Sequence, residues 1–515
     1  MWPRFRRQDF MNIAFYLGTL LLFLAATMLV PVIVSLVFAE YAIVAHYVVG
    51  IGFALAVGSA LRLLRVSPKG LERRQAIAVT GLVWIVAAFV GAVPLWLSGD
   101  FASFFDAFFE AVSCFTATGL SLCKDIDHLS MGDQMWRYLM QFLGGQGVIV
   151  IALSLGIFSQ SGSAFYTAEG REEFVMPYIK RTAQFIWRFS SIVVLAGTVV
   201  LTVVALTLGF APLRAFFQSL WMTIGSYDTS GFAPQSLSVT YYHSAIFEFI
   251  ILALMAMGAL NFAIYARLWH GNWRAAISDF FRDLEIKTLA IWTLVMLVVF
   301  IATMVGNQYI NGLSTVIRRG VFTVVSNTTN TGYQVFSNEQ MSGLLTSGAY
   351  MILIISLAIG GSIGSTAGGI KALRVGIIAK QIVSRIKTLL LPASARDTTS
   401  YIHNGRRLIT TETANAAMIL TLLYMLSYLA GAVAGVVAGY EALPATLESV
   451  TAGSNAGLSS GILTPLTPAF LKTVYILQMW LGRLEFFTLL ALFAGIISSL
   501  KPRRGKAKAK AKAKA

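Results

Sequence analysis

Long apolar runs alternate with short polar connections along the whole chain. Most runs are about twenty residues long, which is enough for an α-helix to cross a hydrocarbon core roughly 30 Å thick. We therefore predict ten membrane-spanning helices. The first run is too long for a cleaved signal, and a second span follows closely, so we expect it to be retained as a helix. The ten runs comprise residues 11–39, 42–61, 76–98, 135–158, 189–211, 244–266, 288–305, 347–370, 412–439 and 470–499.

Four shorter apolar segments precede polar, glycine-containing stretches. At about 1.5 Å of rise per residue, a helix of this length reaches only about halfway across a bilayer and has to turn back. Irregular backbone at that depth is tolerated only where it lines an enclosed or watery cavity. We therefore predict four re-entrant loops around a pore. The half-length segments comprise residues 101–115, 211–225, 311–325 and 441–453.

The four glycine-containing stretches share one pattern of small and hydroxyl-bearing residues. Runs of Gly, Ser and Thr also serve close helix packing in membranes, and a single stretch would favour that interpretation. Four occurrences at matching positions, with an apolar residue after each glycine, favour four equivalent segments arranged around one central axis. The stretches are SCFTATGLS (113–121), SYDTSGFAP (226–234), NTTNTGYQV (327–335) and GSNAGLSSG (453–461), aligned on Gly119, Gly231, Gly332 and Gly457.

The expected fold is an all-α polytopic membrane protein. Two extra N-terminal helices precede four repeats around a central pore, and each repeat consists of a helix, a pore helix, a filter segment and a second helix. The predicted boundaries are 1–70 for the two N-terminal helices, 71–160, 161–272, 273–392 and 393–500 for the repeats, and 501–515 for a basic tail.

Composition and charge support this assignment. The 515 residues are 57% hydrophobic and only 12% charged, too few charges for the surface of a soluble protein of this size. The net charge of +16 gathers at alternate connections, which predicts that both termini are cytoplasmic. We attribute this charge to topology and anionic-lipid contact, and we expect no nucleic-acid binding. The low-complexity tail at 506–515 is expected to be disordered or an addition to the natural sequence.

The residue types of the glycine stretches suit a cation that loses its water. Backbone carbonyls and hydroxyls supply oxygen ligands of moderate field strength, and glycine permits the positive φ that turns a carbonyl inward. The C-terminal ends of the half-helices would also favour cations, and Asp228 would add negative charge near the mouth. The candidate ion-binding residues are Thr116, Thr118, Gly119, Thr229, Ser230, Gly231, Asn330, Thr331, Gly332, Asn455, Ala456 and Gly457.

Five glycines interrupt the eighth apolar run and predict a break in that helix, since each costs roughly 1 kcal/mol in a helix interior. A phosphate-binding P-loop is excluded by the position of Lys371 and by the apolar context. Arg483, midway through the last run, needs a partner, and Glu485 at i+2 lies on another face. Carbonyls of the glycine-rich stretch are better candidates. The candidate gate residues are Gly360, Gly361, Gly364, Ser365, Thr366, Gly368, Gly369 and Arg483.

These motifs together resemble the Trk/Ktr/HKT superfamily of K⁺ transporters, specifically its TrkH-like membrane subunit. The resemblance implies that each repeat donates one filter strand with a central glycine and that residues 360–369 form an intramembrane loop, steadied by Arg483, that obstructs the pore. Glycine at all four filter positions is similar to the K⁺-selective pattern, whereas Asn330 and the proline-free fourth stretch depart from the family. The motifs are DAFFEAVSCFTATGL (106–120), QFLGGQGVIV (141–150), GGSIGSTAGGIKALR (360–374) and MWLGRLEFFT (479–488).

The expected function is regulated K⁺ uptake across the cytoplasmic membrane. A symporter coupled to Na⁺ or H⁺, and a weakly selective K⁺/Na⁺ pathway, remain as alternatives. A membrane enzyme would need clustered nucleophiles or metal ligands; we find none, and the five histidines suggest no metal cluster. The resemblance implies a homodimer on a cytoplasmic, nucleotide-binding regulatory ring (TrkA-like). Segments 267–287 and 371–410 are plausible docking surfaces, and we expect the chain itself to bind no cofactor.

Overall fold

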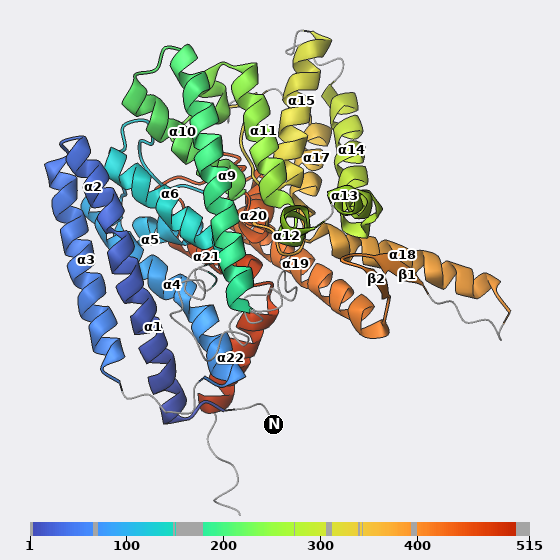
Figure 1. The fold of residues 1–515 in the computed structure, drawn as a ribbon, viewed down its shortest axis with the longest axis horizontal. Helices are drawn as coiled ribbons and strands as arrows, with labels where there is room; N and C mark the ends of the chain where they lie inside the picture. The colour runs from blue at the N-terminus through green and yellow to red at the C-terminus, as the bar shows by residue number, and fades with distance from the viewer. Residues whose placement is uncertain are drawn as a thin grey trace, which may run out of the picture.

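The computed structural model is helical almost throughout (Figure 1). It describes residues 4–64, 71–147, 150, 179–271, 273–304, 312–337, 340–341, 343, 345–392 and 399–500. Several sequence expectations fall outside these residues: the second half of the fourth predicted span, most of the connection that follows it, and the basic tail at 501–515. The all-α, polytopic expectation is confirmed.

The first two predicted spans form a helical hairpin at one side of the molecule, drawn in blue in Figure 1. The first span is α1 (Arg7–Thr27) continued by α2 (Leu29–Val37), and the second is α3 (Tyr41–Arg62). Glycine brings the two spans together, because a Cβ on Gly18 would lie 2.6 Å from the carbonyl oxygen of Gly58.

The rest of the chain repeats one order of elements four times: a long helix, a shorter helix, an extended loop and a second helix. The four long first helices are α4 (Arg73–Leu97), α9 (Ile179–Thr207), α14 (Leu284–Met304) and α19 (Thr411–Val437). The shorter helices, of 12 to 16 residues, are α5 (Phe104–Phe115), α10 (Pro212–Tyr227), α15 (Leu313–Thr328) and α20 (Ala442–Ser454). These short helices coincide with the half-length segments that the sequence predicts.

The second helix is bent or interrupted in the second, third and fourth sets, which the sequence predicts only for the third set. In the first set, α6 (Met131–Gln146) ends before Gly147. In the second and fourth sets, α11 (Ala245–Ala259) meets α12 (Phe262–His270) at 95°, and α21 (Ala469–Arg483) meets α22 (Phe487–Leu500) at 114°. In the third set, a loop separates α17 (Ser347–Ala358) from α18 (Ala372–Leu390). Among the described residues, six helices are long and apolar enough to span a membrane, or up to eight if each bent pair counts as one span.

A few elements lie outside this plan. The 3₁₀-helix η1 (Ser238–Tyr242) follows the second extended loop, and α13 (Trp273–Arg282) is a short amphipathic helix before α14. Strands β1 (Ser400–Ile402) and β2 (Arg406–Leu408) form an antiparallel hairpin with Tyr401 opposite Arg407. Figure 1 shows α18 running away from the bundle with this hairpin beside it.

Candidate ion filter and gate

All four short helices end in the same way. The residue two before each aligned glycine is left-handed, with φ between 50° and 55°. The next N–H donates to the carbonyl five residues earlier, at 2.8–3.1 Å, which is the C-terminal closure of a Schellman motif. This closure turns the chain sharply out of the helix and into the extended loop. The four left-handed residues are Ala117, Thr229, Asn330 and Asn455.

A second glycine in each set fits against the end of the short helix. A Cβ on Gly144 would lie 1.9 Å from the Phe115 carbonyl oxygen, and a Cβ on Gly258 would lie 1.9 Å from that of Tyr227. Each carbonyl belongs to the residue four positions before the aligned glycine. The matching distances are 2.7 Å from Gly360 to Thr328 and 2.2 Å from Gly482 to Gly453. Three second helices, and in the third set Gly360 just beyond α17, are therefore held against the ends of the short helices at equivalent points.

The four aligned glycines meet at one place. A Cβ built on Gly119 would lie 1.9 Å from the Ser230 carbonyl oxygen, and one on Gly231 would lie 2.1 Å from that of Thr331. A Cβ on Gly332 would lie 2.2 Å from the Leu458 nitrogen. The four loops are therefore in direct backbone contact, and no side chain fits at these positions.

The four loops are nevertheless not equivalent. Gly119, Gly231 and Gly332 have positive φ values of 96°, 71° and 81°, as the sequence argument expects, whereas Gly457 is absent from the positive-φ residues. The Gly457 N–H also donates to the Thr331 carbonyl at 2.9 Å. The fourth loop thus differs from the other three in its backbone at the aligned glycine.

The hydroxyl groups beside the first and third glycines brace the loops. Thr116 and Thr118 share a hydrogen bond of 2.7 Å, and Thr329 and Thr331 share one of 2.9 Å. The Thr116 and Thr329 hydroxyls also donate to helix carbonyls four residues earlier, both at 2.8 Å. These side chains tie each loop to the end of its own short helix.

The left-handed asparagines of the third and fourth loops also anchor these loops. Asn330 Nδ2 donates to the Leu357 carbonyl at 2.7 Å, and Asn455 Nδ2 donates to the Met479 carbonyl at 2.9 Å and to Thr118 Oγ1 at 3.0 Å. Asparagine tolerates the left-handed conformation that both positions require. Their side chains therefore join each loop to its surroundings.

Two buried carboxylates hold the first and fourth loops in matching registers. Glu110 accepts from the Ser121 hydroxyl at 3.0 Å and the Leu122 N–H at 2.9 Å. Glu448 accepts from the Ser459 hydroxyl at 2.6 Å and the Ser460 N–H at 3.2 Å. Each glutamate therefore ties its own short helix to the loop that follows it. Glu110 also forms a fully buried ion pair with Arg137, at 2.7 Å.

Asp228 does not lie at the mouth of the loops, and that expectation is wrong. It caps the C-terminal end of α10, is fully buried, and accepts a hydrogen bond from Gln146 Nε2 at 2.8 Å. Asp228 directly follows α10, and a Cβ built on Gly145 would lie 2.5 Å from its Cγ, so its side chain faces the end of α6.

The glycine-rich stretch between α17 and α18 packs against the ends of three short helices. The Gly361 N–H donates to the Thr328 carbonyl of α15 at 3.2 Å, and the Thr366 hydroxyl donates to the Tyr227 carbonyl of α10 at 2.9 Å. A Cβ on Gly368 would lie 2.0 Å from the Ser454 carbonyl oxygen of α20. This stretch, residues 359–371, is named the intramembrane loop below.

Arg483 joins this loop to the first set. Its guanidinium donates to the Thr366 carbonyl at 3.1 Å and to the Gly144 and Gly145 carbonyls at 2.5 and 2.8 Å. Arg483 is the last residue of α21 and lies directly before the bend. In the bend, Glu485 and Phe486 have positive φ. Glu485 forms an ion pair with Arg374 instead.

A buried polar cluster that the sequence does not predict reaches the intramembrane loop from the opposite side. Glu285 Oε1 accepts from the Ile363 N–H at 2.7 Å, and Asp283 Oδ1 accepts from the Glu285 N–H at 2.8 Å. His403, in the turn of the β-hairpin, lies 3.1 Å from Asp283. The scattered histidines suggest no metal cluster in the sequence, but the fold brings ligand atoms of His403, Asp283 and Glu285 within 4.8 Å of one another. His403 and Asp283 are 120 residues apart in the chain.

The comparisons with known proteins agree with this architecture. Residues 43–501 match the family model described as TrkH, cation transport protein. An uncharacterised cation transporter of Methanocaldococcus jannaschii is 29% identical over 497 residues, which cover 95% of this chain and 97% of that protein. The Trk system potassium uptake protein TrkH of Escherichia coli strain K12 is 28% identical over 492 residues, covering 92% and 96%.

A solved structure extends the likeness to the fold. The crystal structure of the potassium transporter TrkH from Vibrio parahaemolyticus superposes with a TM-score of 0.80 over 97% of this chain and 99% of that one, at 23% identity. At that identity the likeness concerns the fold alone. Because the family model matches nearly the whole chain, the protein belongs to the TrkH family of cation transport proteins.

Proposed function

We propose that the four converging loops form a filter for K⁺ and that this protein carries K⁺ into the cell. The observation that carries the proposal is the contact of four glycine backbones from four separate segments, at a place where no side chain fits. Such a site offers only backbone carbonyls and small hydroxyls, which are the ligands that replace water around an alkali cation. The relatives from E. coli and V. parahaemolyticus are named as a potassium uptake protein and a potassium transporter.

The intramembrane loop is the proposed gate. Its hydrogen bonds to the Thr328 and Tyr227 carbonyls, at the C-terminal ends of α15 and α10, support a position beneath the proposed filter. Opening requires this loop to move, and Arg483 and Glu285 each hold it by one backbone hydrogen bond. The ion path is therefore obstructed while both contacts are made.

The orientation follows from charge. Described basic residues cluster where α12, α13, α18 and the β-hairpin gather, and we propose that this side faces the cytoplasm. The loops then face outward. We further propose that two copies assemble on a cytoplasmic nucleotide-binding ring, which supplies the regulation that this chain's own residues do not. The hairpin is a suitable docking point, because His403, Asp283 and Glu285 connect it to the loop.

Ion flux into liposomes that contain the purified protein tests the function. We expect uptake of K⁺ and Rb⁺ to exceed that of Na⁺ and to proceed under a K⁺ gradient alone. Flux that requires a pH or Na⁺ gradient would establish a coupled symporter and overturn the channel-like mechanism. Equal K⁺ and Na⁺ uptake would overturn the selectivity.

A further inference from the structure

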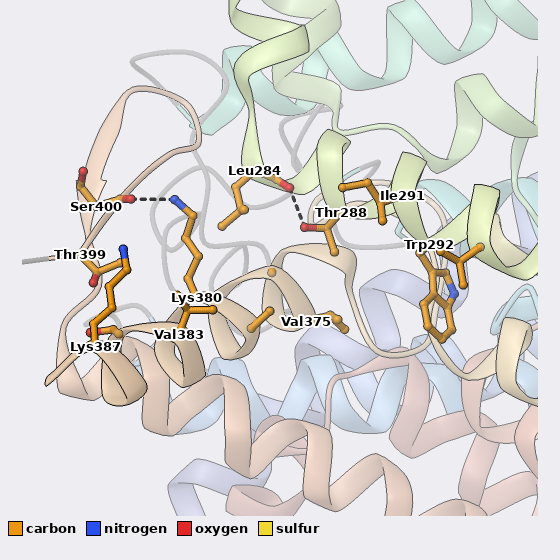
Figure 2. Close-up of a pocket in the computed structure, with 14 residues that line it drawn as sticks. Leu284, Thr288, Ile291, Trp292, Val375, Lys380, Val383, Lys387, Thr399 and Ser400 are labelled. Carbon is orange, nitrogen blue, oxygen red and sulfur yellow. Dashed lines mark hydrogen bonds between the residues drawn. The ribbon is translucent and has the colours of Figure 1, made fainter. Parts of the chain in front are cut away.

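A groove lies between α14, α18 and the β-hairpin. Its volume is about 760 Å³, within the range of sites that bind organic ligands. Figure 2 shows Trp292 and Ile291 of α14 and Val375 of α18 toward one end, and Lys380, Lys387 and Ser400 at the other. The groove is therefore amphipathic along its length.

The apolar wall belongs to a surface that faces the bilayer. On α14, Ile291 is 63% exposed and Val295 is 45% exposed, although this helix is long and apolar enough to span a membrane. In a membrane protein such side chains contact acyl chains. The groove thus continues the lipid-facing surface of α14 inward, toward α18.

The other end of the groove is basic. None of the fourteen described residues that line the groove is acidic. Lys380 Nζ donates to the Ser400 carbonyl at 2.8 Å, which uses one of the three donors of its ammonium group. Helix α18 itself has four basic residues and no acidic one. Two ammonium groups beside a hydroxyl-bearing strand are suited to a phosphate.

We propose that this groove binds an anionic phospholipid of the cytoplasmic leaflet. The phosphate lies between Lys380 and Lys387, and an acyl chain follows Val375, Ile291 and Trp292. Basic pockets between transmembrane helices on the cytoplasmic side are suited to such head groups, because lysine ammonium groups near the membrane surface attract anionic lipid.

Charge favours a lipid over a second copy of this chain as the occupant. A two-fold interface places the same patch of both copies face to face. Pairing α18 with its own copy would bring together Lys380, Arg385 and Lys387 from each side, with no acidic residue on either helix. An anion between the lysines removes this repulsion.

The groove also bears on the proposed gate, and this consequence rests on the proposed function. Helix α18 starts directly after the intramembrane loop, with the Ala372 N–H bonded to the Gly361 carbonyl at 3.1 Å. At Gly376, α18 approaches α14 so closely that a Cβ would lie 2.5 Å from Thr288 Oγ1. A lipid seated between these helices therefore fixes the distance between α18 and α14. It thereby also fixes the position of the end of the intramembrane loop that leads into α18.

The test is lipid binding by the intact, purified protein. Delipidated protein is titrated with phosphatidylglycerol and with phosphatidylcholine of the same acyl chains, and bound lipid is counted by native mass spectrometry. We expect at least tenfold tighter binding of phosphatidylglycerol, lost in Lys380→Gln/Lys387→Gln. Arg385→Gln is the matched control, because Arg385 is exposed on α18 outside the groove. Equal binding of the two lipids, or equal losses in the double variant and the control, would overturn the proposal.

A second variant tests the groove without a change of charge. Ala379 lines the groove, so Ala379→Trp is expected to fill it and to lower phosphatidylglycerol binding as the double variant does. Mass photometry of the same samples reports their oligomeric state. Loss of the dimer with lipid binding intact would assign the groove to a second copy and overturn the lipid site. Because the readout is bound lipid, its failure is distinct from a failure of ion transport.

Discussion

The backbone at Gly332 leaves no space for even a methyl group. A Cβ there would lie 2.2 Å from the Leu458 nitrogen and 2.3 Å from the Gly457 nitrogen, and its φ of 81° disfavours any other residue. We predict that Gly332→Ala displaces the third and fourth loops and lowers K⁺ flux at least tenfold in liposomes. Gly439→Ala is the control, because Gly439 has a φ of 96° with open space at its Cβ. Wild-type flux in Gly332→Ala would contradict the filter assignment.

Arg483 is the residue expected to steady the gate most strongly. Its guanidinium bonds a loop carbonyl and two carbonyls at the end of α6, so its loss frees the loop from the first set. We predict that Arg483→Ala raises basal K⁺ flux several-fold, measured without any regulatory partner. Arg214→Ala, which removes an exposed arginine bonded to Tyr241, is expected to leave flux unchanged. Unaltered flux in Arg483→Ala would remove it from the mechanism.

For individual residues, the sequence predicted the positions of the four loops well but the roles of single side chains less well. The aligned glycines meet as expected, because glycine is needed where backbones touch. The left-handed residues two positions earlier were missed, although asparagine at two of the four positions was an available signal. Asp228 was misplaced because a sequence does not tell which side of a loop a side chain faces.

Among the elements, the short helices α5 and α20 carry the same glutamate anchor with different partners. Glu110 pairs with the fully buried Arg137, whereas the described partners of Glu448 are hydroxyl and backbone N–H groups. We predict that Glu110→Gln costs about 3–5 kcal/mol, because it leaves a buried guanidinium without its counter-charge. Glu448→Gln is expected to cost about 1 kcal/mol. Thermal unfolding in detergent should rank the two in this order, and equal or reversed losses would contradict the argument.

The link between the β-hairpin and the intramembrane loop gives a second prediction for the gate. The Glu285 carboxylate accepts a hydrogen bond from the Ile363 N–H, so Glu285→Ala removes one restraint on the intramembrane loop. We expect a rise in basal K⁺ flux that is smaller than in Arg483→Ala, because Arg483 joins the loop to α6 whereas Glu285 bonds the loop at the Ile363 N–H. Glu412→Ala, at an exposed position in the first turn of α19, is the matched control. A flux equal to that of the control would show that the cluster does not restrain the loop.

The interrupted helices mark the limit of prediction at the scale of elements. The break after α17 was predictable, since five glycines oppose a helix. The bend at residues 484–486 was not, because Leu484, Glu485 and Phe486 carry no such signal. Asn261 caps α12 through its side chain, with the Ala263 N–H at 2.8 Å, and this cap could have been recognised. Tertiary contacts at Gly144, Gly258 and Gly482 explain where the other helices stop.

For the whole molecule, apolar periodicity was sufficient to predict an all-α membrane protein with four similar units. It was not sufficient to predict contacts between units, because Gly119 and Gly457 are far apart in sequence and meet only in the fold. The cluster of Asp283, Glu285 and His403 was missed for the same reason. The boundaries of the four repeats and the assembly with a regulatory ring remain predictions.

The central claim, a K⁺ filter made of four glycines, is tested most directly by the K⁺/Na⁺ permeability ratio of single replacements. The ratio is obtained from reversal potentials in planar bilayers with K⁺ on one side and Na⁺ on the other. We predict a ratio well above one for the wild type and a several-fold fall in Gly119→Ser, because the added hydroxymethyl group meets the Ser230 carbonyl. An unchanged ratio in Gly119→Ser, or a ratio of one in the wild type, would contradict the account.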